Sequence, residues 1–311
     1  MPNNNIVVIG SCMIDFVCYV DRLPKHGETV VGSNFCTNFG GKGSNQCVAA
    51  AKLGGNTLMI ARVGDDLWGE KYLQNFKDVG VDHRFVKKTL GFTNGIAQIS
   101  VAKNAENQIV IVPGANTELS ETDVENAKEE IENAAVVVCQ LETPITSALK
   151  AIKLTKGISI LNGAPGLNDF PIELLTTPSI FCVNESEAEL FSKLPITSID
   201  EALIAAKKFI GMGCKTIIIT LGGEGSVYMN NDGSDPEHVI CPKVNAVDTT
   251  GAGDAFVGAL AYFIASEPGL SLKEAILKAG FVASKSTTLP GTQISYPNKN
   301  VLDEIKSKNL L

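Results

Sequence analysis

The feature that most constrains the fold is a repeated alternation of short apolar runs with longer segments of helical pattern. The apolar runs have the length of buried strands and lie at residues 5–10, 57–62, 135–141, 158–162, 179–184 and 215–222. The helical segments lie among them, at 44–53, 68–79, 121–133, 145–155, 186–191 and 199–212. Ser120 and Asp123, at the start of the third segment, have the pattern of a capping box. Strands that alternate with helices favour a parallel sheet covered on both faces. We therefore predict an α/β fold, a three-layer α/β/α sandwich around a central, mostly parallel sheet.

Two regions interrupt this alternation. Residues 15–39 alternate apolar and polar side chains between turn residues, and residues 92–112 have the pattern of a β-hairpin around the sequence KNAENQ. We predict that these strands form a small second sheet, a lid on a single domain that spans residues 1–311. Because a small sheet is marginally stable by itself, we also expect two copies of the chain to form a homodimer through it.

Composition narrows the class of partners. The formal net charge is −8 and no basic cluster occurs, which argues against nucleic acid or anionic membranes as partners. The eight cysteines are scattered without a C-x-x-C pair, which favours neither zinc nor a redox dithiol and is typical of a reducing compartment. The N-terminus lacks the pattern of a signal peptide. We expect a cytoplasmic protein, with the nucleus as a second open location.

Glycine-rich loops carry most of the functional information. In NFGGKGSNQ (38–46), glycines precede an Ala-rich helix, so the backbone can approach a ligand and present free N–H groups. Lys42, Asn45 and Gln46 add side-chain hydrogen bonds, but Gly43 after the lysine departs from the Walker pattern. A second loop, TLGGEG (220–225), follows a strand and suits nucleotide phosphates or a ribose. Plain turns are the alternative interpretation of both loops.

A third loop, DTTGAGDAF (248–256), leads into an apolar helix. The backbone amides of Gly251, Ala252 and Gly253 can bind a phosphoryl group at the helix N-terminus. Asp254 lies in the first turn, where a carboxylate complements the dipole of any helix. Two anions at one helix end would repel each other, unless a substrate hydroxyl gives its proton to Asp254 as the phosphoryl group arrives. Both interpretations of Asp254 remain open at this point.

These motifs resemble the ribokinase and phosphofructokinase-B family of sugar kinases along almost the whole chain. GGKGSNQ (40–46) and DTTGAGDAF (248–256) resemble its two signatures, NESE (184–187) its N-x-x-E motif and TLGGEG its ATP loop. GSCMIDF (10–16), QLET (140–143) and GTQISYP (291–297) are similar to the ribokinase branch more than to the adenosine or fructose branches. The resemblance implies a ribokinase-like fold and ATP-dependent phosphorylation of D-ribose at its 5-hydroxyl, which gives D-ribose 5-phosphate.

The resemblance also implies roles for individual residues. Asp254 would be the general base, and the amides of Gly251, Ala252 and Gly253 would form the anion hole. The sugar would contact Met13, Ile14, Asp15, Gly41, Lys42, Gly43, Ser44, Asn45, Glu142 and Asp254. ATP would contact Asn184, Thr220, Leu221, Gly222, Gly223, Glu224, Gly225, Gly253, Asp254 and Gly280. Asn184 and Glu187 would hold Mg²⁺ through water. The activating K⁺ would be bound by Asp248, Thr250, Ser286, Leu289, Gly291 and Ser295.

Three residues depart from the family pattern. Met13 stands where bacterial members often carry Asn, Gly280 where many members place Asn or His beside adenine, and Leu289 lies on the cation loop. The change at Gly280 leaves the nucleotide preference open. A kinase for another sugar or a nucleoside, and a sugar- or nucleotide-binding regulator without turnover, remain alternatives. An NAD dehydrogenase is disfavoured because no G-x-G-x-x-G follows the first strand.

Overall fold

The computed structural model describes residues 4–104 and 106–308. Within these ranges, nine strands form one large sheet in the order β13-β12-β11-β10-β9-β8-β1-β4-β5. Neighbouring strands pair in parallel in the part of this order that runs from β11 through β1 to β5. The strands β12 and β13 add antiparallel pairs at one edge. Their bounds are β1 (Asn5–Ile9), β4 (Asn56–Gly64), β5 (Asp82–Thr89), β8 (Val136–Cys139), β9 (Ile158–Asn162), β10 (Ile180–Asn184), β11 (Thr216–Thr220), β12 (Ser226–Asn230) and β13 (Glu237–Val239).

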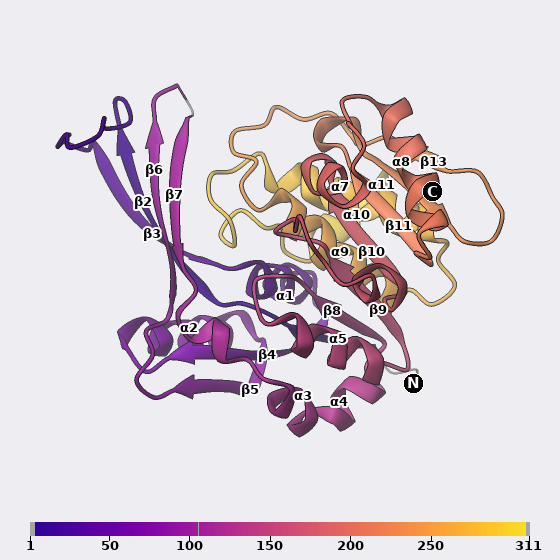
Figure 1. Cartoon of the computed structure of the whole chain (residues 1–311), viewed down its shortest axis with the longest axis horizontal. Coiled ribbons are helices and arrows are strands. Elements are labelled where there is room, and N and C mark those ends of the chain that lie inside the picture. The colour runs from indigo at the N-terminus through magenta and orange to yellow at the C-terminus, as the bar shows by residue number, and fades with distance from the viewer. Residues whose placement is uncertain (1–3, 105, 309–311) are drawn as a thin grey trace.

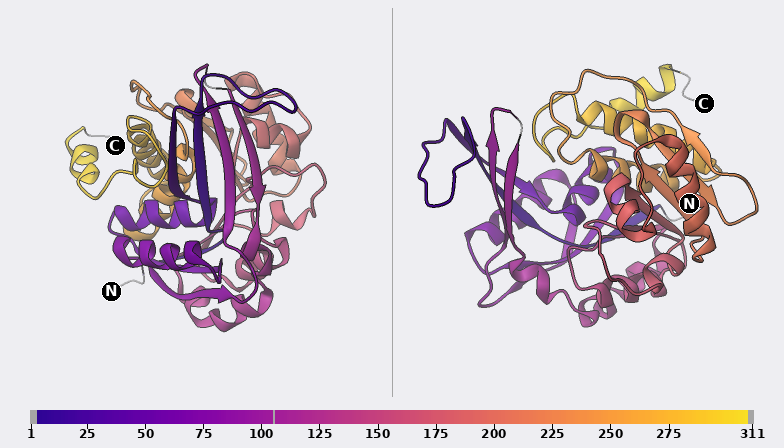
Figure 2. Two further views of the ribbon diagram at one scale, coloured as in Figure 1. Left: turned by 90° about the vertical axis from the view of Figure 1, so that its left-hand side faces the viewer. Right: turned by 45° about the horizontal axis from the view of Figure 1, so that its top comes forward.

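Helices cover both faces of this sheet, as Figures 1 and 2 show. Alternate residues of each strand enter two separate apolar cores, for example Val8 in one and Val7 in the other. The core with Val8 is closed by α1 (Lys42–Lys52), α2 (Leu67–Val79), α9 (Ala252–Ser266), α10 (Leu272–Ser286) and α11 (Val301–Ser307). The core with Val7 is closed by α3 (Glu121–Asn126), α4 (Lys128–Asn133), α5 (Ile145–Leu154), α6 (Glu173–Thr176), α7 (Glu185–Ser192) and α8 (Ile199–Gly211). The predicted three-layer α/β/α sandwich is confirmed.

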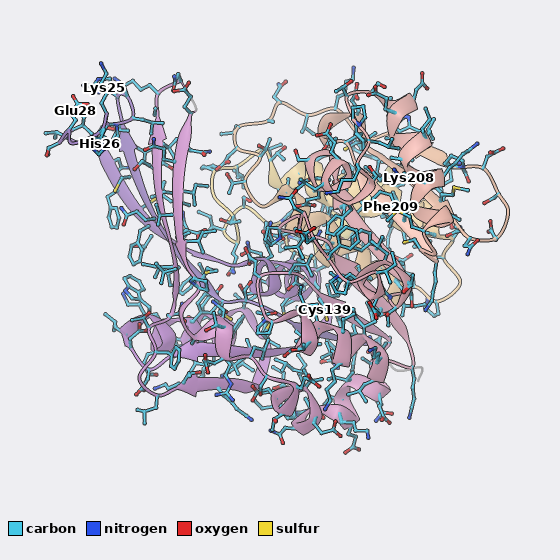
Figure 3. All side chains as sticks on the ribbon, viewed as in Figure 1. Lys25, His26, Glu28, Cys139, Lys208 and Phe209 are labelled. Atoms are coloured by element: carbon cyan, nitrogen blue, oxygen red, sulfur yellow. The ribbon has the colours of Figure 1, made fainter. Side chains whose placement is uncertain are left out.

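A second, smaller sheet stands away from the large one (Figure 1). Its order is β3-β2-β6-β7, with β2 (Met13–Val20), β3 (Asn34–Gly40), β6 (Gly95–Ala102) and β7 (Asn107–Val112). Lys25, His26 and Glu28 lie at its far end, in the connection between β2 and β3 (Figure 3). The single domain over 1–311 and the lid role of this sheet stay predictions. Residues 1–3, 105 and 309–311, which the predicted domain includes, lie outside the described residues.

Two local expectations need correction. The predicted helix over 121–133 is two helices, because Ala127 leaves the helical conformation with φ −108° and ψ 17°. The strand β5 was not predicted, since its charged sequence DHRFVKKT gives no apolar run. It lies at the edge of the sheet, where one side is free of a neighbouring strand and charged side chains are tolerated. The predicted capping box of Ser120 and Asp123 is present.

Two further observations concern the cysteines and the apolar character of the helices. All eight cysteines are free, and Cys12, Cys47, Cys139, Cys182 and Cys214 are buried. Over the residues that the structure describes, we find no helix with both the length and the apolar character that crossing a membrane requires.

Candidate active site

The polar residues of the candidate site gather where the parallel strands of the large sheet end. Ser11 follows β1, Glu142 follows β8, and Asn162, Asn184 and Thr220 are the last residues of β9, β10 and β11. Asn184 and Thr220 are direct partners in the parallel register. In open α/β sheets, ligands bind outside the carboxyl ends of the strands. The topology alone therefore assembles a binding edge from residues that are far apart in the sequence.

The loop before α1 is packed tightly against the end of β1. A Cβ atom at Gly43 would lie 2.6 Å from the backbone nitrogen of Ser11, so this position accepts only glycine. The close approach lets one carboxylate oxygen of Glu142 accept hydrogen bonds from the Lys42 backbone N–H (2.8 Å) and from Ser11 Oγ (2.5 Å). Glu142 is thereby fixed at the N-terminus of α1, where the helix dipole favours negative charge.

Asp254 is the third residue of α9 and is 8% exposed. The helix is preceded by Gly251, whose φ of 75° lies in the left-handed region that favours glycine. A Cβ atom there would also lie 2.3 Å from Cγ2 of Thr292. The two carboxylate oxygens of Asp254 accept hydrogen bonds from Asn45 Nδ2 and Gln46 Nε2, each at 2.9 Å. Two successive residues of α1 thus hold the carboxylate at the N-terminus of α9.

Acidic groups outnumber cations in this cluster. Burial, followed by the charges of Glu142 and Asp254, raises the pKa of Asp15 to about 7. Burial opposes the charge on Lys42, but Asp254, Glu142 and Glu187 outweigh it and raise the Lys42 pKa. These shifts require the five side chains to lie within electrostatic reach of one another. The cluster offers carboxylate acceptors and the ammonium donors of Lys42, the chemistry that suits a ligand rich in hydroxyl groups.

The residues expected to contact a nucleotide form a continuous path beside this cluster. Asn184 and Glu187 cap α7 reciprocally, with Asn184 N–H donating to Glu187 Oε2 at 2.9 Å and Glu187 N–H donating to Asn184 Oδ1 at 2.8 Å. Burial, partly offset by the Asn184 N–H, raises the pKa of Glu187. Burial raises the pKa of Glu185, and the charge of Glu224 in the TLGGEG loop adds to the shift. The N-terminus of α7 and that loop are therefore neighbours.

The TLGGEG loop forms the turn between β11 and β12. The same segment is the one expected to contact ATP, so a turn and a nucleotide-binding loop do not exclude each other. Gly225 packs against the segment after β13, where a Cβ atom would lie 2.1 Å from the Val239 carbonyl oxygen. The adjacent Cys241 Sγ contacts the Gly280 carbonyl oxygen at 3.6 Å. A Cβ atom at Gly280 would meet only Cys241 Sγ, at 4.0 Å, so the absence of a side chain leaves open space there.

The residues of the expected cation loop also come together. The two carboxylate oxygens of Asp248 accept the backbone N–H groups of Thr250 (2.9 Å) and Gly291 (2.8 Å). Burial opposes the charge of Asp248, but the Thr250 side chain and the N–H groups of Gly291 and Thr250 outweigh it and lower its pKa. The Leu289 N–H donates to the Ser286 carbonyl at 3.4 Å, and Ser295 Oγ donates to the Thr292 carbonyl at 2.8 Å. The oxygen atoms gathered here belong to a carboxylate, backbone carbonyls and hydroxyls. Such ligands suit a hard cation.

The fit to a divalent metal is different. Asn184 Oδ1 and Glu187 Oε2 are both used within the cap, which leaves Glu187 Oε1 free to bind a metal-bound water. In the described part of the chain, no group of three or more His, Cys, Asp or Glu side chains could hold a metal directly. The residues present therefore suit a metal that keeps several waters and binds mainly to a ligand's phosphates.

Several polar residues of the site were not assigned a role from the sequence. Gln140 and Asn162 contact Gln46, Gln293 contacts Asn45, and Ser11 binds Glu142. The sequence pattern that could have identified some of them is a polar residue at the end of an apolar strand, as at Ser11 and Asn162. Among the assigned residues, Ile14 belongs to the apolar core, and Met13 Sδ accepts a hydrogen bond from Asn116 Nδ2 at 3.7 Å.

The fold and the two glycine-rich helix starts define a carbohydrate kinase. A model of the pfkB family of carbohydrate kinases matches residues 3–299, and the chain belongs to this family. The predicted family and enzyme class are confirmed. The chain is 42% identical over 300 residues to a ribokinase from Mus musculus, covering 96% of this chain and 93% of the relative. It is 37% identical over 310 residues to a deoxyribokinase from Salmonella typhi, covering 98% and 99%.

A solved ribokinase structure has a similar fold. The Arabidopsis thaliana ribokinase complexed with ribose and ATP superposes with a TM-score of 0.87 at 30% sequence identity. The match covers 98% of this chain and 99% of that one. The likeness extends over the whole fold, since both chains are matched almost completely.

Proposed function

We propose that this chain transfers the γ-phosphoryl group of ATP to the 5-hydroxyl of D-ribose. The observation that carries the proposal is the arrangement of Asp254, a buried carboxylate at the N-terminus of α9 with each oxygen oriented by one amide. The similarity to ribokinases, and to the structure that contains ribose and ATP, supports this substrate pair.

The chemistry follows from the positions of charge. The Asp254 carboxylate accepts the proton of the 5-hydroxyl as the new O–P bond forms, and the bond from the γ-phosphorus to the β–γ bridging oxygen breaks to release ADP. The amides of Gly251 and Gly253, joined by that of Ala252 once it releases the Thr249 carbonyl (3.1 Å), take the charge that develops on the transferred group. Asp15, Gly41, Lys42, Asn45 and Glu142 bind the other hydroxyl groups, together with the backbone at Met13, Ile14, Gly43 and Ser44.

The nucleotide binds along Asn184, Gly280 and the loop from Thr220 to Gly225. Adjacent strand ends at Asn184 and Thr220 support this placement. Mg²⁺ is held through water by Asn184 and Glu187, and when bound it neutralises phosphate charge. The open space at Gly280 leaves room for more than one base, so the nucleotide preference needs a direct comparison of ATP with GTP.

A monovalent cation binds the loop of Asp248, Thr250, Ser286, Leu289, Gly291 and Ser295 and activates turnover. The hydrogen bond from Gly291 to Asp248, and that from Tyr296 Oη to the Gly251 carbonyl (3.2 Å), support a link between this loop and the anion hole. We expect faster turnover in potassium than in a large organic cation, and a weaker potassium response for Asp248→Ala. Equal rates in potassium, sodium and the organic cation would contradict the role.

The small sheet forms a lid and also the contact of a homodimer. Large apolar side chains on it are exposed, including Phe35 (56%), Val110 (64%) and Ile111 (52%), which supports burial against a second copy. Light scattering at micromolar concentration should give twice the mass of one chain, and a monomeric mass would contradict the dimer. A location in the cytoplasm or nucleus stays a prediction.

The substrate assignment is tested by coupled ADP release with D-ribose, 2-deoxyribose, fructose and adenosine. We expect the highest kcat/KM for D-ribose. The deoxyribokinase relative makes 2-deoxyribose the second candidate, and a higher kcat/KM for that sugar would replace ribose as the substrate. ADP release with none of the four would reject the proposed function and favour a binding protein without turnover.

A further inference from the structure

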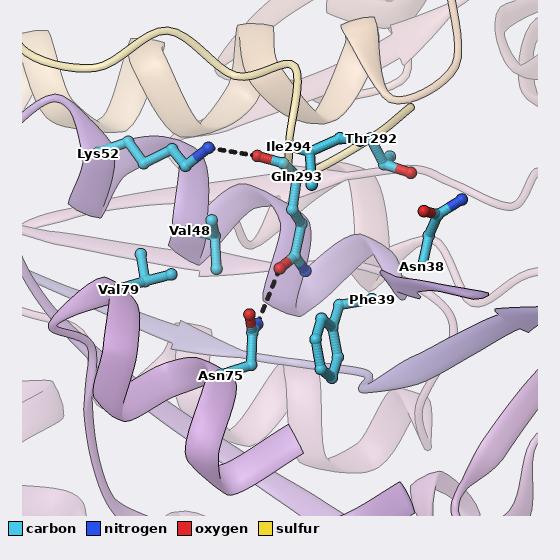
Figure 4. A pocket seen from close by; sticks show the side chains of 9 residues that line it. All are labelled: Asn38, Phe39, Val48, Lys52, Asn75, Val79, Thr292, Gln293 and Ile294. Atoms are coloured by element: carbon cyan, nitrogen blue, oxygen red, sulfur yellow. Dashed lines mark hydrogen bonds between the residues drawn. The ribbon is translucent and has the colours of Figure 1, made fainter. Parts of the chain in front are cut away.

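A line of amide side chains runs from a cavity to Asp254. The cavity has a volume of about 140 Å³ and lies between α1, α2 and the loop that carries Gln293 (Figure 4). Asn75 Nδ2 donates to Gln293 Oε1 at 3.0 Å, and Gln293 Nε2 donates to Asn45 Oδ1 at 2.9 Å. Asn45 Nδ2 donates in turn to Asp254 Oδ2 at 2.9 Å. Gln293, Asn45 and Asp254 are buried, at 6%, 4% and 8% exposure.

The direction of each amide in this line is dictated by chemistry. A carboxylate only accepts hydrogen bonds, so Asn45 must turn its NH₂ group toward Asp254 and its oxygen toward Gln293. That oxygen only accepts, so Gln293 must turn its own NH₂ group toward Asn45. Tyr72 enforces the same orientation, because its hydroxyl donates to the Gly40 carbonyl at 2.5 Å and accepts from Gln293 Nε2 at 3.1 Å.

The main chain of Gln293 is fixed as well. Lys52 Nζ on α1 donates to the carbonyl oxygens of Gln293 (2.5 Å) and Tyr296 (3.3 Å). Figure 4 shows Lys52 and Asn75 reaching Gln293 from opposite sides of the cavity. Backbone and side chain of Gln293 are therefore held from α1 and α2, although the residue itself lies on the loop after α10.

We propose that Gln293 is a positioning residue for phosphoryl transfer, which acts by fixing the orientation of the Asn45 amide. With Gln293 in place, an N–H donor of Asn45 faces the carboxylate of Asp254. Without it, the Asn45 oxygen is a buried acceptor that has lost its donor, so the Asn45 side chain is free to move away from the carboxylate of Asp254. The inference rests on the proposed role of Asp254 as the general base.

The other oxygen of Asp254 is held independently, which sets the size of the expected effect. Gln140 Nε2 donates to Gln46 Oε1 at 2.7 Å, and Gln46 Nε2 donates both to Asp254 Oδ1 (2.9 Å) and to Asn162 Oδ1 (3.0 Å). This second line of amides shares no residue with the first except Asp254. Loss of Gln293 should therefore weaken the orientation of Asp254 without abolishing it.

The test is Gln293→Met, which keeps the length of the side chain and removes its donors. We expect kcat to fall about tenfold, the effect of one hydrogen bond in the transition state, with a smaller change in the KM for the sugar. A residue that only fills space would lower the stability of the protein without this larger change in kcat than in KM.

Val79→Ala is the matched control, since Val79 lines the same cavity and donates no side-chain hydrogen bond. We expect the kcat and the KM for the sugar of this variant to match those of the wild type. If Gln293→Met does not fold, Gln293→Asn replaces it, because it keeps an amide that is one methylene too short to reach Asn45.

Two results separate this inference from the proposed function. A folded Gln293 variant with wild-type kcat overturns the positioning role, while turnover by the wild type leaves the proposed function intact. A wild-type protein that phosphorylates none of the sugars tested rejects the proposed function itself, and the positioning role with it.

Discussion

Two buried aspartates occupy the same position in two helices of this protein and have opposite surroundings. Asp123 is the third residue of α3 and Asp254 the third residue of α9, with exposures of 3% and 8%. Asp123 accepts hydrogen bonds from Arg62 Nε and Nη2 (both 2.9 Å), Lys87 Nζ (3.1 Å) and the backbone and hydroxyl of Ser120 (both 3.0 Å). Asp254 accepts hydrogen bonds from two neutral amides.

The hydrogen-bond donors distinguish a structural carboxylate, Asp123, from the carboxylate that we propose as the general base, Asp254. A carboxylate has about four lone-pair sites, and the donors around Asp123 occupy all of them. Burial opposes the charge of Asp123, but Arg62, Ser120 and Lys87 outweigh it and lower its pKa to about 2. The amides around Asp254 leave lone pairs free to accept a proton. The same helix position thus ties β4 and β5 to α3 in one case and holds the proposed general base in the other.

The largest expected effect is that of Asp254→Asn. This change keeps the shape and removes the base, so kcat should fall by about 10²–10⁴-fold, or roughly 3–5 kcal/mol of transition-state stabilisation. Ribose binding should weaken much less, because an amide still hydrogen-bonds a hydroxyl. The measurements are kcat, ribose Kd and Tm beside wild type. A folded variant with kcat within about threefold of wild type would remove Asp254 from the chemistry.

Asp123→Asn is the mirror-image variant. It places an amide NH₂ group against Arg62 and Lys87 and leaves the partly buried Arg62 guanidinium without its counterion. Breaking such a pair should lower the free energy of unfolding by about 3 kcal/mol. The kcat of the folded fraction should stay at the wild-type value, as measured by urea unfolding and by assay at low temperature. A stable variant with reduced kcat would show that Asp123 and Asp254 are not separate in function.

How much of this contrast the sequence predicts depends on how local each contact is. The capping box of Ser120 and Asp123 was predicted, because its partners lie within one helical turn. The contact of Asp123 with Arg62 spans 61 residues, and Lys87 lies on the edge strand β5 that the sequence pattern missed. Likewise, the loops around Lys42 and Asp254 were recognised as motifs, but the hydrogen bond from Gln293 to Asn45 spans 248 residues. Such contacts depend on strand order and helix packing, which no local pattern contains.

The third prediction concerns pH and the lowered pKa of Asp123. In the unfolded chain this carboxyl titrates near its ordinary value of 3.8, and in the folded protein at about 2. Its contribution to stability is therefore complete above about pH 5 and is lost as the pH falls toward 2, with a size of about 2 kcal/mol. Urea unfolding of wild type and Asp123→Asn at pH 6, 5, 4 and 3 should give a stability difference that is constant down to pH 5 and then shrinks. A difference that stays constant to pH 3 would contradict the lowered pKa.

The smallest expected effect is that of Lys87→Met. We compare it with Arg62→Met, since Arg62 and Lys87 are the two cations that contact Asp123. Lys87 is 41% exposed and contributes one hydrogen bond, whereas Arg62 is 22% exposed and contributes two in a planar, bidentate arrangement. Lys87→Met keeps the apolar stem of the side chain, so it should cost about 0.5–1 kcal/mol, the range of a partly exposed ion pair, and the cost should diminish in high salt. Arg62→Met should cost about 3 kcal/mol and depend little on salt, because it leaves the buried Asp123 without its main partner. Urea unfolding at low and high salt measures both. Equal costs for the two variants would mean that the total charge near Asp123, rather than the bidentate geometry of Arg62, makes this aspartate a structural one.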